Sequence, residues 1–233
     1  MRAVNWERWA LAAGIGFVVL TVVAFIAGGE PPTVTDSSAE LISYYEGDRG
    51  QVLVSSLLFG LGLLFFLWFA GAIANLLRVG GQARLGATLT SAATAFVAVQ
   101  LVLTGIGASL AYSIAGQGEA GVVKALFDLQ WVLDLFAAFP SAAVFTAASI
   151  GLMRTGVLPA WLGWGGVAVA VLFILRSTNW AHEGFWSPTG GYVVILIIVA
   201  LLWTLTTSVL LFRKAPATTS ADPPRQSTAT TAR

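Results

Sequence analysis

Three polar side chains interrupt an otherwise apolar stretch in the middle of the chain, and they are the first candidates for chemistry. Asp128, Gln130 and Asp134 lie within residues 124–154, where most other side chains are apolar or small. An ionisable group in a membrane-spanning helix is costly. A carboxylate at such a position therefore marks either a proton or ligand site or a specific ion pair. The surrounding elements must supply the partners.

The composition places the chain among helical membrane proteins. Its 233 residues are 57% hydrophobic and only 10% charged, whereas soluble domains carry about 25% charged residues. The mean hydropathy is +0.83. The apolar runs are continuous over about twenty residues, which favours spanning α-helices over the alternating segments of a β-barrel.

Two further counts exclude classes of function. The chain has no cysteine, which excludes disulfides, thiolate metal sites, haem attachment and a cysteine nucleophile. The formal net charge is +1, so no nucleic-acid partner is indicated.

The apolar runs predict an all-α, polytopic bundle of six transmembrane helices in a membrane domain of residues 1–213. The expected helices span residues 9–27, 51–77, 85–115, 123–153, 159–176 and 192–212. The first run is longer than the apolar region of a signal peptide and is interpreted as an uncleaved helix. Residues 214–233 are rich in Pro, Thr, Ser and Ala, and are expected to form a disordered cytoplasmic tail.

The first loop carries a helix-start signal. Ser37 and Glu40 have the spacing of a capping box, in which each side chain accepts a hydrogen bond from the backbone N–H of the other. A short amphipathic helix at about 37–46, with Leu41, Tyr44 and Tyr45 on one side, is expected at the outer membrane surface. An ordinary ordered loop is the alternative.

The basic residues predict the orientation. With both termini on one side, that side holds nine Lys and Arg residues and the other side holds three. The positive-inside rule then places both termini in the cytoplasm of a cell membrane. The nine are Arg2, Arg8, Arg78, Arg84, Arg154, Arg213, Lys214, Arg225 and Arg233, and the three are Arg49, Lys124 and Arg176.

Helix register predicts partners for Asp134. Counting outward from the short turn after Arg154 puts Arg176 within one turn of Asp134, near the outer edge of the hydrocarbon. The same counting on the preceding helix puts Thr104 level with Asp134 and Gln100 one turn below. The sequence thus predicts an Asp134–Arg176 ion pair assisted by Thr104 or Gln100. A titrating or ligand-binding Asp134 is the alternative.

Two other local features bear on this region. Lys124 and Asp128 are four residues apart and can pair on one helix face. Pro140 removes a helical hydrogen bond and clashes with the carbonyl of Phe136. The resulting kink could open a cavity below Asp134, although a proline in a membrane helix is also commonly plain geometry.

The last outer loop contains the only histidine. His182 and Glu183 are adjacent, but a metal site needs three or four converging ligands, so no metal or other cofactor is expected. The neighbouring Trp180, Phe185 and Trp186 are typical of an interfacial aromatic belt. The alternative is a lid that brings His182 near Asp128.

Small residues recur at four-residue spacing on three of the expected helices. Such stripes let helices approach closely in lipid, and they predict mutual contact of the third, fourth and fifth helices, unless Ala and Gly are merely abundant. The stripes are Ala87, Ser91 and Ala95; Ala143, Ala147 and Gly151; and Gly166 and Ala170.

Two stretches carry a resemblance. Residues 38–46 (Ser-Ala-Glu-Leu-Ile-Ser-Tyr-Tyr-Glu) with Asp-Arg-Gly at 48–50, and Leu-Phe-Gly-Leu at 58–61 with Phe-Phe-Leu-Trp-Phe-Ala-Gly at 65–71, resemble a family of uncharacterised six-helix membrane proteins of high-GC bacteria. The resemblance is best in the first loop and second helix and weakens beyond the third. It implies the six-helix topology and assigns no catalytic or binding residue.

The chain lacks the motifs of common enzyme classes. It has no phosphate-binding glycine loop, no HExxH and no GxSxG, and Asp128 and Asp134 point to different helix faces. The leading expectation is a non-enzymatic accessory or binding protein whose outer polar vestibule holds a small molecule, a lipid or a partner helix. The alternative is a small proton-coupled transporter or permease that uses Asp134. An intramembrane enzyme would need an ionisable cluster that the sequence does not contain.

Overall fold

The structure, a computed structural model, describes residues 6–117 and 119–214, and no strand occurs within these ranges. Nearly all of the expected tail lies outside the described residues. Each expected helix overlaps a helix of the structure. In chain order the elements are α1 (Trp6–Gly28), α2 (Ser38–Gly47), α3 (Arg49–Val79), α4 (Ala83–Ser109), the π-helical turn η1 (Leu110–Ile114), α5 (Ala115–Gln117), α6 (Ala120–Phe136), α7 (Ala138–Arg154), α8 (Ala160–Arg176) and α9 (Gly191–Lys214).

Five helical stretches of the described chain are long and apolar enough to cross a membrane, which indicates a membrane protein. The sixth apolar helix, α8, has 17 residues and is therefore about 25 Å long, slightly less than the hydrocarbon thickness of a typical bilayer. The five stretches are Trp6–Gly28, Arg49–Val79, Ala83–Gln117, Ala120–Arg154 and Gly191–Lys214.

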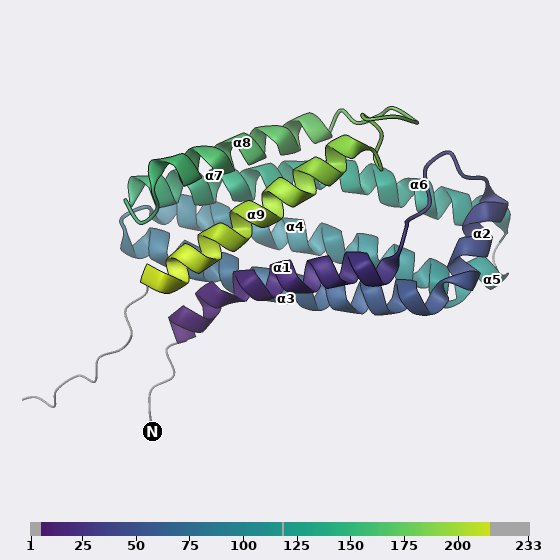
Figure 1. Ribbon diagram of the computed structural model, residues 1–233, viewed down its shortest axis with the longest axis horizontal. Coiled ribbons are helices and arrows are strands. Elements are labelled where there is room, and N and C mark those ends of the chain that lie inside the picture. Colours follow the sequence, from purple (N-terminus) through teal and green to yellow (C-terminus); the bar gives the residue numbers. More distant parts are fainter. Residues whose placement is uncertain (1–5, 118, 215–233) are drawn as a thin grey trace, which may run out of the picture.

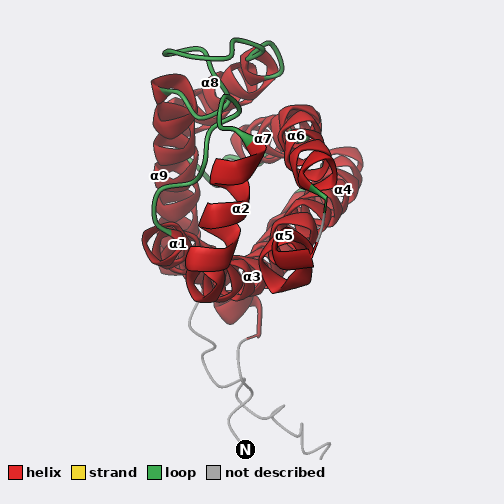
Figure 2. Cartoon of the chain, turned by 90° about the vertical axis from the view of Figure 1, so that its right-hand side faces the viewer, coloured by secondary structure: helices red, strands yellow, loops and turns green. Residues whose placement is uncertain are grey.

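The apolar helices form a closed ring. Going round it, α1 contacts α3, α3 contacts α4, α4 contacts α7, α7 contacts α8, α8 contacts α9, and α9 returns to α1. Figure 2 shows the ring from one end, with most of its helices seen end-on. Buried side chains such as Phe66, Leu77, Phe145 and Trp203 belong to one continuous core that joins these helices. We call this part the bundle.

Three of the helices continue past the others at one end. In Figure 1, α3, the α4–α5 stretch and α6 extend beyond α1, α8 and α9, and α2 lies across their ends. A second, smaller core holds α2 against these extensions. We call residues 33–57, 106–117 and 119–131 the cap. Its buried members are Leu41, Tyr45, Leu110, Ala111, Ala115, Val123 and Phe127.

Two expected helices are less regular than the sequence suggested. The expected helix at 123–153 is divided at Ala137, which separates α6 from α7. Pro140 lies three residues beyond the break and has no N–H to donate to the carbonyl of Phe136. The expected helix at 85–115 contains η1, a turn with i→i+5 hydrogen bonding.

Small residues lie at the helix contacts, but only some of them are the residues that the four-residue spacing predicted. On α7 and α8, Ala147, Gly151, Gly166 and Ala170 are buried. On α4 the predicted stripe of Ala87, Ser91 and Ala95 is exposed instead. The third and fifth expected helices, α4 and α8, are also not neighbours in the ring.

The residue that α4 uses for close approach is Gly86. A Cβ added there would lie 2.8 Å from the carbonyl oxygen of Ala74 on α3. Backbone contact at this distance explains why a glycine is required. The expected stripe was wrong because a small residue on an apolar helix does not by itself distinguish a helix-facing side from a lipid-facing side.

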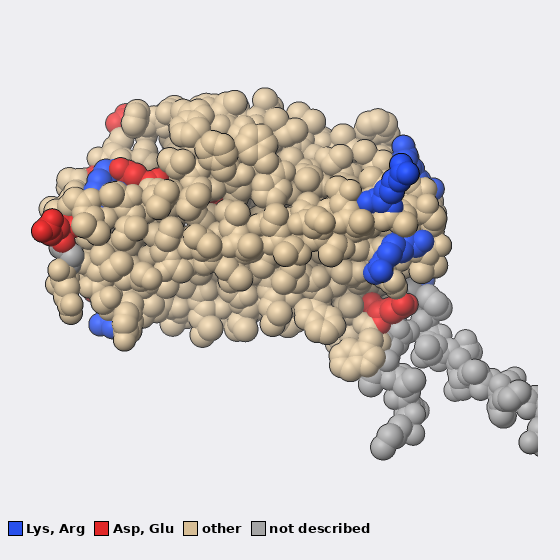
Figure 3. Space-filling model, turned by 180° about the vertical axis from the view of Figure 1, so that it is seen from behind, with Lys and Arg blue, Asp and Glu red and all other residues tan. Residues whose placement is uncertain are grey.

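Charged residues gather at the two ends of the molecule. Figure 3 shows Lys and Arg side chains concentrated at one end and acidic side chains at the other, with a wide uncharged band between them. We call the first the basic end. Its described members are Arg8, Arg78, Arg84, Arg154, Arg213 and Lys214. The cap lies at the opposite end.

Candidate functional site

Asp134 is paired with Arg176, as the register counting predicted. Asp134 lies in the last turn of α6 and Arg176 is the last residue of α8. The Nη2 atom of Arg176 forms an ion pair with Oδ2 of Asp134. The side chains are 9% and 19% exposed, respectively. A charge-assisted contact of this kind satisfies both groups where water is scarce.

The same arginine also reaches the backbone at the helix break. Its Nη1 atom lies 3.4 Å from both Oδ1 and the carbonyl oxygen of Asp134. Immediately after the break, the Oγ of Ser141 donates to the carbonyl of Ala137 at 2.7 Å. Arg176 therefore joins α8 to the junction of α6 and α7, and its charge also lies at the C-terminal end of α8, where a cation is favourable.

Gln100 and Thr104 do not complete this pair. The hydroxyl of Thr104 donates to the carbonyl of Gln100 within α4, at 2.7 Å. One residue of α6 that contacts α4 is Gln130, whose Nε2 lies 3.3 Å from the position of a Cβ on Gly107. The relative heights of the two helices were estimated well, but the polar partner on α4 was not: the α6 side chain at this level packs closely over Gly107.

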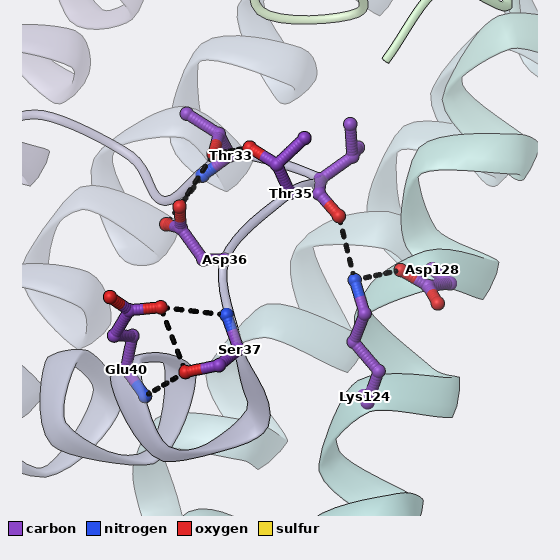
Figure 4. Close-up of polar contacts among 8 residues, drawn as sticks. Thr33, Thr35, Asp36, Ser37, Glu40, Lys124 and Asp128 are labelled. Carbon is purple, nitrogen blue, oxygen red and sulfur yellow. Dashed lines mark hydrogen bonds and ion pairs between the residues drawn. The ribbon is translucent and has the colours of Figure 1, made fainter. Parts of the chain in front are cut away.

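Lys124 forms the predicted pair with Asp128 and makes a contact that was not predicted. Its Nζ lies 2.8 Å from Oδ1 of Asp128 and 2.8 Å from the carbonyl oxygen of Val34. Figure 4 shows Lys124 reaching from α6 to both groups. The lysine thus ties the loop before α2 to α6.

The start of α2 is fixed by two carboxylates, also drawn in Figure 4. Glu40 accepts the backbone N–H of Ser37 at 2.7 Å, while the Ser37 hydroxyl accepts the N–H of Glu40. Thr33 donates its hydroxyl and its N–H to Asp36. The hydrogen bonds from Thr33 hold the pKa of Asp36 below its usual value, and those from Ser37 do the same to the pKa of Glu40.

His182 and Glu183 are exposed in the loop between α8 and α9. Within the described residues, no ion pair or hydrogen bond joins either of them to Asp128. The loop is instead held by aromatic contacts near the bundle: Trp180 lies edge-on to Phe136 with ring centroids 6.5 Å apart. The alternative of a lid that brings His182 near Asp128 therefore finds no support in these contacts, and α2 lies across the cap end (Figure 1).

The sequence reasoning missed Asn179. Its side chain is fully buried, and neither of its polar atoms has a hydrogen-bond partner. Its backbone N–H donates to the carbonyl of Arg176, whose Nε is also buried without a partner. The signal available in the sequence was an asparagine three residues after the arginine, at the end of an apolar helix.

The contacts of Asp134, Arg176, Lys124 and Asp128 join different helices and loops of the molecule. No group of three or more His, Asp or Glu side chains that could hold a metal ion occurs in residues 6–117 and 119–214. Two shallow hollows of the described surface are lined by other residues and do not adjoin Asp134. One of them is lined by Phe139, Ala142 and Ile174 and lies beside Pro140, on the side of Asp134 toward the basic end where the kink was expected to open a cavity, but Asp134 does not line it.

Comparisons with known proteins do not identify a family or a function for the chain. No protein-family model matches the chain, and neither a curated protein nor a solved structure is significantly similar to it. The resemblance to six-helix membrane proteins of high-GC bacteria stays a hypothesis.

Proposed function

We propose that this chain is a multi-pass protein of the cytoplasmic membrane with six spans, both termini in the cytoplasm and the cap on the outer face. Its role is non-enzymatic: the cap is a binding platform for a small molecule, a lipid or a partner helix, and the bundle anchors it. The outer cap and the inner basic end are then the two water-facing surfaces.

Charge supports this orientation. The basic end carries six described cations with Glu7 as the nearby acid, whereas the cap end carries most of the described carboxylates. Cytoplasmic loops are enriched in Lys and Arg. The position of α8 between α7 and α9 in the ring supports a sixth span, since Arg176 at its end can extend the reach of a short helix.

The closed Asp134–Arg176 pair is the observation that carries the accessory role. A proton-coupled permease needs a carboxylate that exchanges protons with both compartments along an open path. Here the carboxylate is engaged by a guanidinium that is itself 9% exposed. The competing transport function would require this pair to open during each cycle.

Side-specific labelling tests the proposal directly. The chain has no cysteine, so single-cysteine variants report one position each when treated with a membrane-impermeant thiol reagent. Thr35→Cys lies in the exposed loop before α2, and Val79→Cys lies at the exposed end of α3. Ser149→Cys replaces a fully buried hydroxyl of α7 with a group of similar shape.

The expected pattern is that Thr35→Cys reacts only from outside, Val79→Cys only from inside, and Ser149→Cys from neither side. Labelling of Thr35→Cys from the cytoplasm would overturn the orientation. Labelling of Ser149→Cys from both sides would show an alternating path through the bundle and would favour the transport function.

A further inference from the structure

A hollow opens on the side of the cap, between α3 and the π-helical turn η1. It has a volume of about 440 Å³ and is lined by Leu53 of α3 and by Ala108, Ser109, Tyr112, Ser113 and Ile114. Ser109, Tyr112 and Ser113 are exposed. The wider turn of a π-helix displaces side chains from their α-helical positions, and such turns are frequent at binding sites.

Arg49 supplies an available positive charge beside this hollow. Its guanidinium carbon lies 5.5 Å from the ring centroid of Tyr112, which is within the range of a cation–π contact. The side chain is exposed. In the described residues the two other cations of this end are committed, Lys124 to Asp128 and Arg176 to Asp134, and no carboxylate forms an ion pair with Arg49.

The hollow lies at the depth of lipid headgroups. Leu53 is 25 residues from Arg78 along α3, which corresponds to about 37 Å of helix. Ser109 and Tyr112 are about 37 and 42 Å from Arg84 along the α4 stretch. A bilayer is about 30 Å thick in its hydrocarbon and 40–45 Å with its headgroups. With the basic turns at the inner edge of the hydrocarbon, as used for Asp134, the outer headgroup layer begins about 30 Å along these helices and ends at about 36 Å. The membrane-facing rim of the hollow at Leu53 and Ser109 therefore adjoins the outer headgroups, and Tyr112 lies at their water-facing side.

Apolar surface continues below the hollow toward the membrane centre. One and two turns from Leu53 on the same face of α3, Leu57 and Leu61 are exposed. On α4, Gly105 lies one turn below Ser109, and a Cβ added there would meet nothing within 4 Å. The surface therefore offers an uncrowded path for an acyl chain.

Acidic side chains lie on the side of the hollow away from the membrane. The carboxylate of Glu46, at the end of α2, lies 3.0 Å from the position of a Cβ on Gly116, one turn beyond Tyr112. Asp48 directly precedes Arg49. Neither carboxylate is in an ion pair within the described part of the chain. The surface thus presents positive charge at the hollow and negative charge farther out.

We propose that this hollow binds the headgroup of an outer-leaflet phospholipid with a primary ammonium group, such as phosphatidylethanolamine. Arg49 binds the phosphate, assisted by the hydroxyls of Ser109, Tyr112 or Ser113, and the ammonium group lies toward Glu46 and Asp48. The order of charges matches a headgroup in which the phosphate lies nearer the glycerol and the amine lies farther out. The inference rests on the orientation proposed above.

Native mass spectrometry of the full chain in detergent tests this inference, with equimolar phosphatidylethanolamine and phosphatidylglycerol competing for binding. We expect at least fivefold higher occupancy by phosphatidylethanolamine. Arg49→Gln should reduce that occupancy at least fivefold, and Glu46→Gln should bring the ratio of the two lipids toward one. Arg84→Gln, an exposed arginine at the basic end, is the matched control and should change neither.

A groove-filling variant tests the location independently of charge. Ser109→Trp should abolish the preference for phosphatidylethanolamine while far-ultraviolet circular dichroism remains that of the unaltered protein. Equal or stronger binding of phosphatidylglycerol, or unchanged binding in Arg49→Gln, would overturn the inference. Equally tight binding of glycerophosphoethanolamine, which has no acyl chains, would identify a soluble ligand instead and would also overturn it.

The outcome is separable from that of the proposed function. If Thr35→Cys is labelled only from outside but the lipid preference is absent, this inference fails while the orientation and anchoring role stand. If Thr35→Cys is labelled from the cytoplasm, the depth argument fails together with the proposed orientation.

Discussion

The bundle and the cap are two helical regions of one chain that are stabilised in different ways. In the bundle, glycines let backbones approach and hydroxyl or indole groups donate to carbonyls of neighbouring helices, as Ser208 does to Leu11 at 2.6 Å and Trp203 to Leu162 at 2.9 Å. In the cap, α2 inserts Leu41 and Tyr45 into a small apolar core.

The difference follows from the surroundings of each region. Lipid chains are as apolar as leucine, so helices in the membrane gain little from burying apolar area and depend on close packing and hydrogen bonds. A cap in contact with water gains from removing apolar surface from the solvent. On the orientation proposed above, the chain uses membrane-type packing on the basic-end side of Asp134 and soluble-type packing in the cap.

The largest contrast is expected from two fully buried leucines, one in each region. Leu41→Ala in the cap should lower the free energy of opening α2 by about 3 kcal/mol, because both the transfer and the cavity contributions are lost. Leu63→Ala in the bundle should cost roughly half as much, because the transfer contribution is small in lipid. Both side chains are 0% exposed.

Hydrogen exchange of backbone amides in lipid nanodiscs measures both effects. Protection of α2 should fall in Leu41→Ala while protection of the bundle helices is unchanged. If Leu63→Ala proves as destabilising as Leu41→Ala, the two regions do not differ in the way described.

The second contrast concerns glycines of the bundle. A Cβ at Gly166 of α8 would clash with the Oγ of Ser149 and lie 2.7 Å from the indole of Trp203, whereas a Cβ at Gly71 of α3 would meet nothing within 4 Å. Gly166→Ala should destabilise by about 2 kcal/mol through overpacking.

Gly71→Ala is the control and should be neutral or slightly stabilising, because alanine is the better helix former. Thermal unfolding in detergent, followed by circular dichroism, compares the two variants. Equal melting temperatures would mean that close approach at Gly166 does not hold α8 in the ring.

A smaller effect is expected at the start of α2. Ser37→Ala removes one half of the capping box and should reduce the stability of α2 by about 1 kcal/mol. Ser43→Ala, on the exposed face of the same helix, removes a hydroxyl that takes no part in the capping box. Amide exchange in α2 should accelerate only in Ser37→Ala, and equal acceleration in both variants would contradict this role.

The smallest effect is a dependence of α2 on pH. Hydrogen bonds lower the pKa of Asp36 and of Glu40 from their ordinary values of 3.8 and 4.5. A lowered pKa in the folded state contributes stability that is complete above the ordinary pKa and is lost as the pH falls through the lowered one. Protection of α2, corrected for intrinsic exchange rates, should therefore decline below about pH 4 while that of the bundle stays constant.

The sequence predicted the helices well and their side-chain contacts unevenly. Continuous apolar runs locate the helices, and short turns fix the level of antiparallel neighbours, which is why the Asp134–Arg176 contact could be predicted. Gln100 and Thr104 were assigned wrongly because a threonine in a helix readily donates to its own helix backbone. Counting residues from a turn gives the position of a residue along the helix axis, but not the direction in which its side chain points around that axis.

Other features depend on tertiary structure that local patterns do not encode. The exposed stripe at Ala87 and the close approach at Gly86 differ by one residue, and only the position of α3 distinguishes them. The π-helical turn at 110–114 has no sequence signal comparable to a capping box. Arg49 was counted as one of three outer cations, but its place beside Tyr112 depends on how α3 and α4 extend into the cap.

The central claim is that Asp134 and Arg176 form a structural pair at the boundary between bundle and cap. A double-mutant cycle of Asp134→Asn, Arg176→Gln and the combined variant tests it through unfolding in detergent. Each single change should cost about 3 kcal/mol by leaving one poorly solvated charge without its partner. The combined change should recover at least half of the summed loss. Strictly additive losses would contradict the account, because Asp134 would then be free to act as a proton carrier.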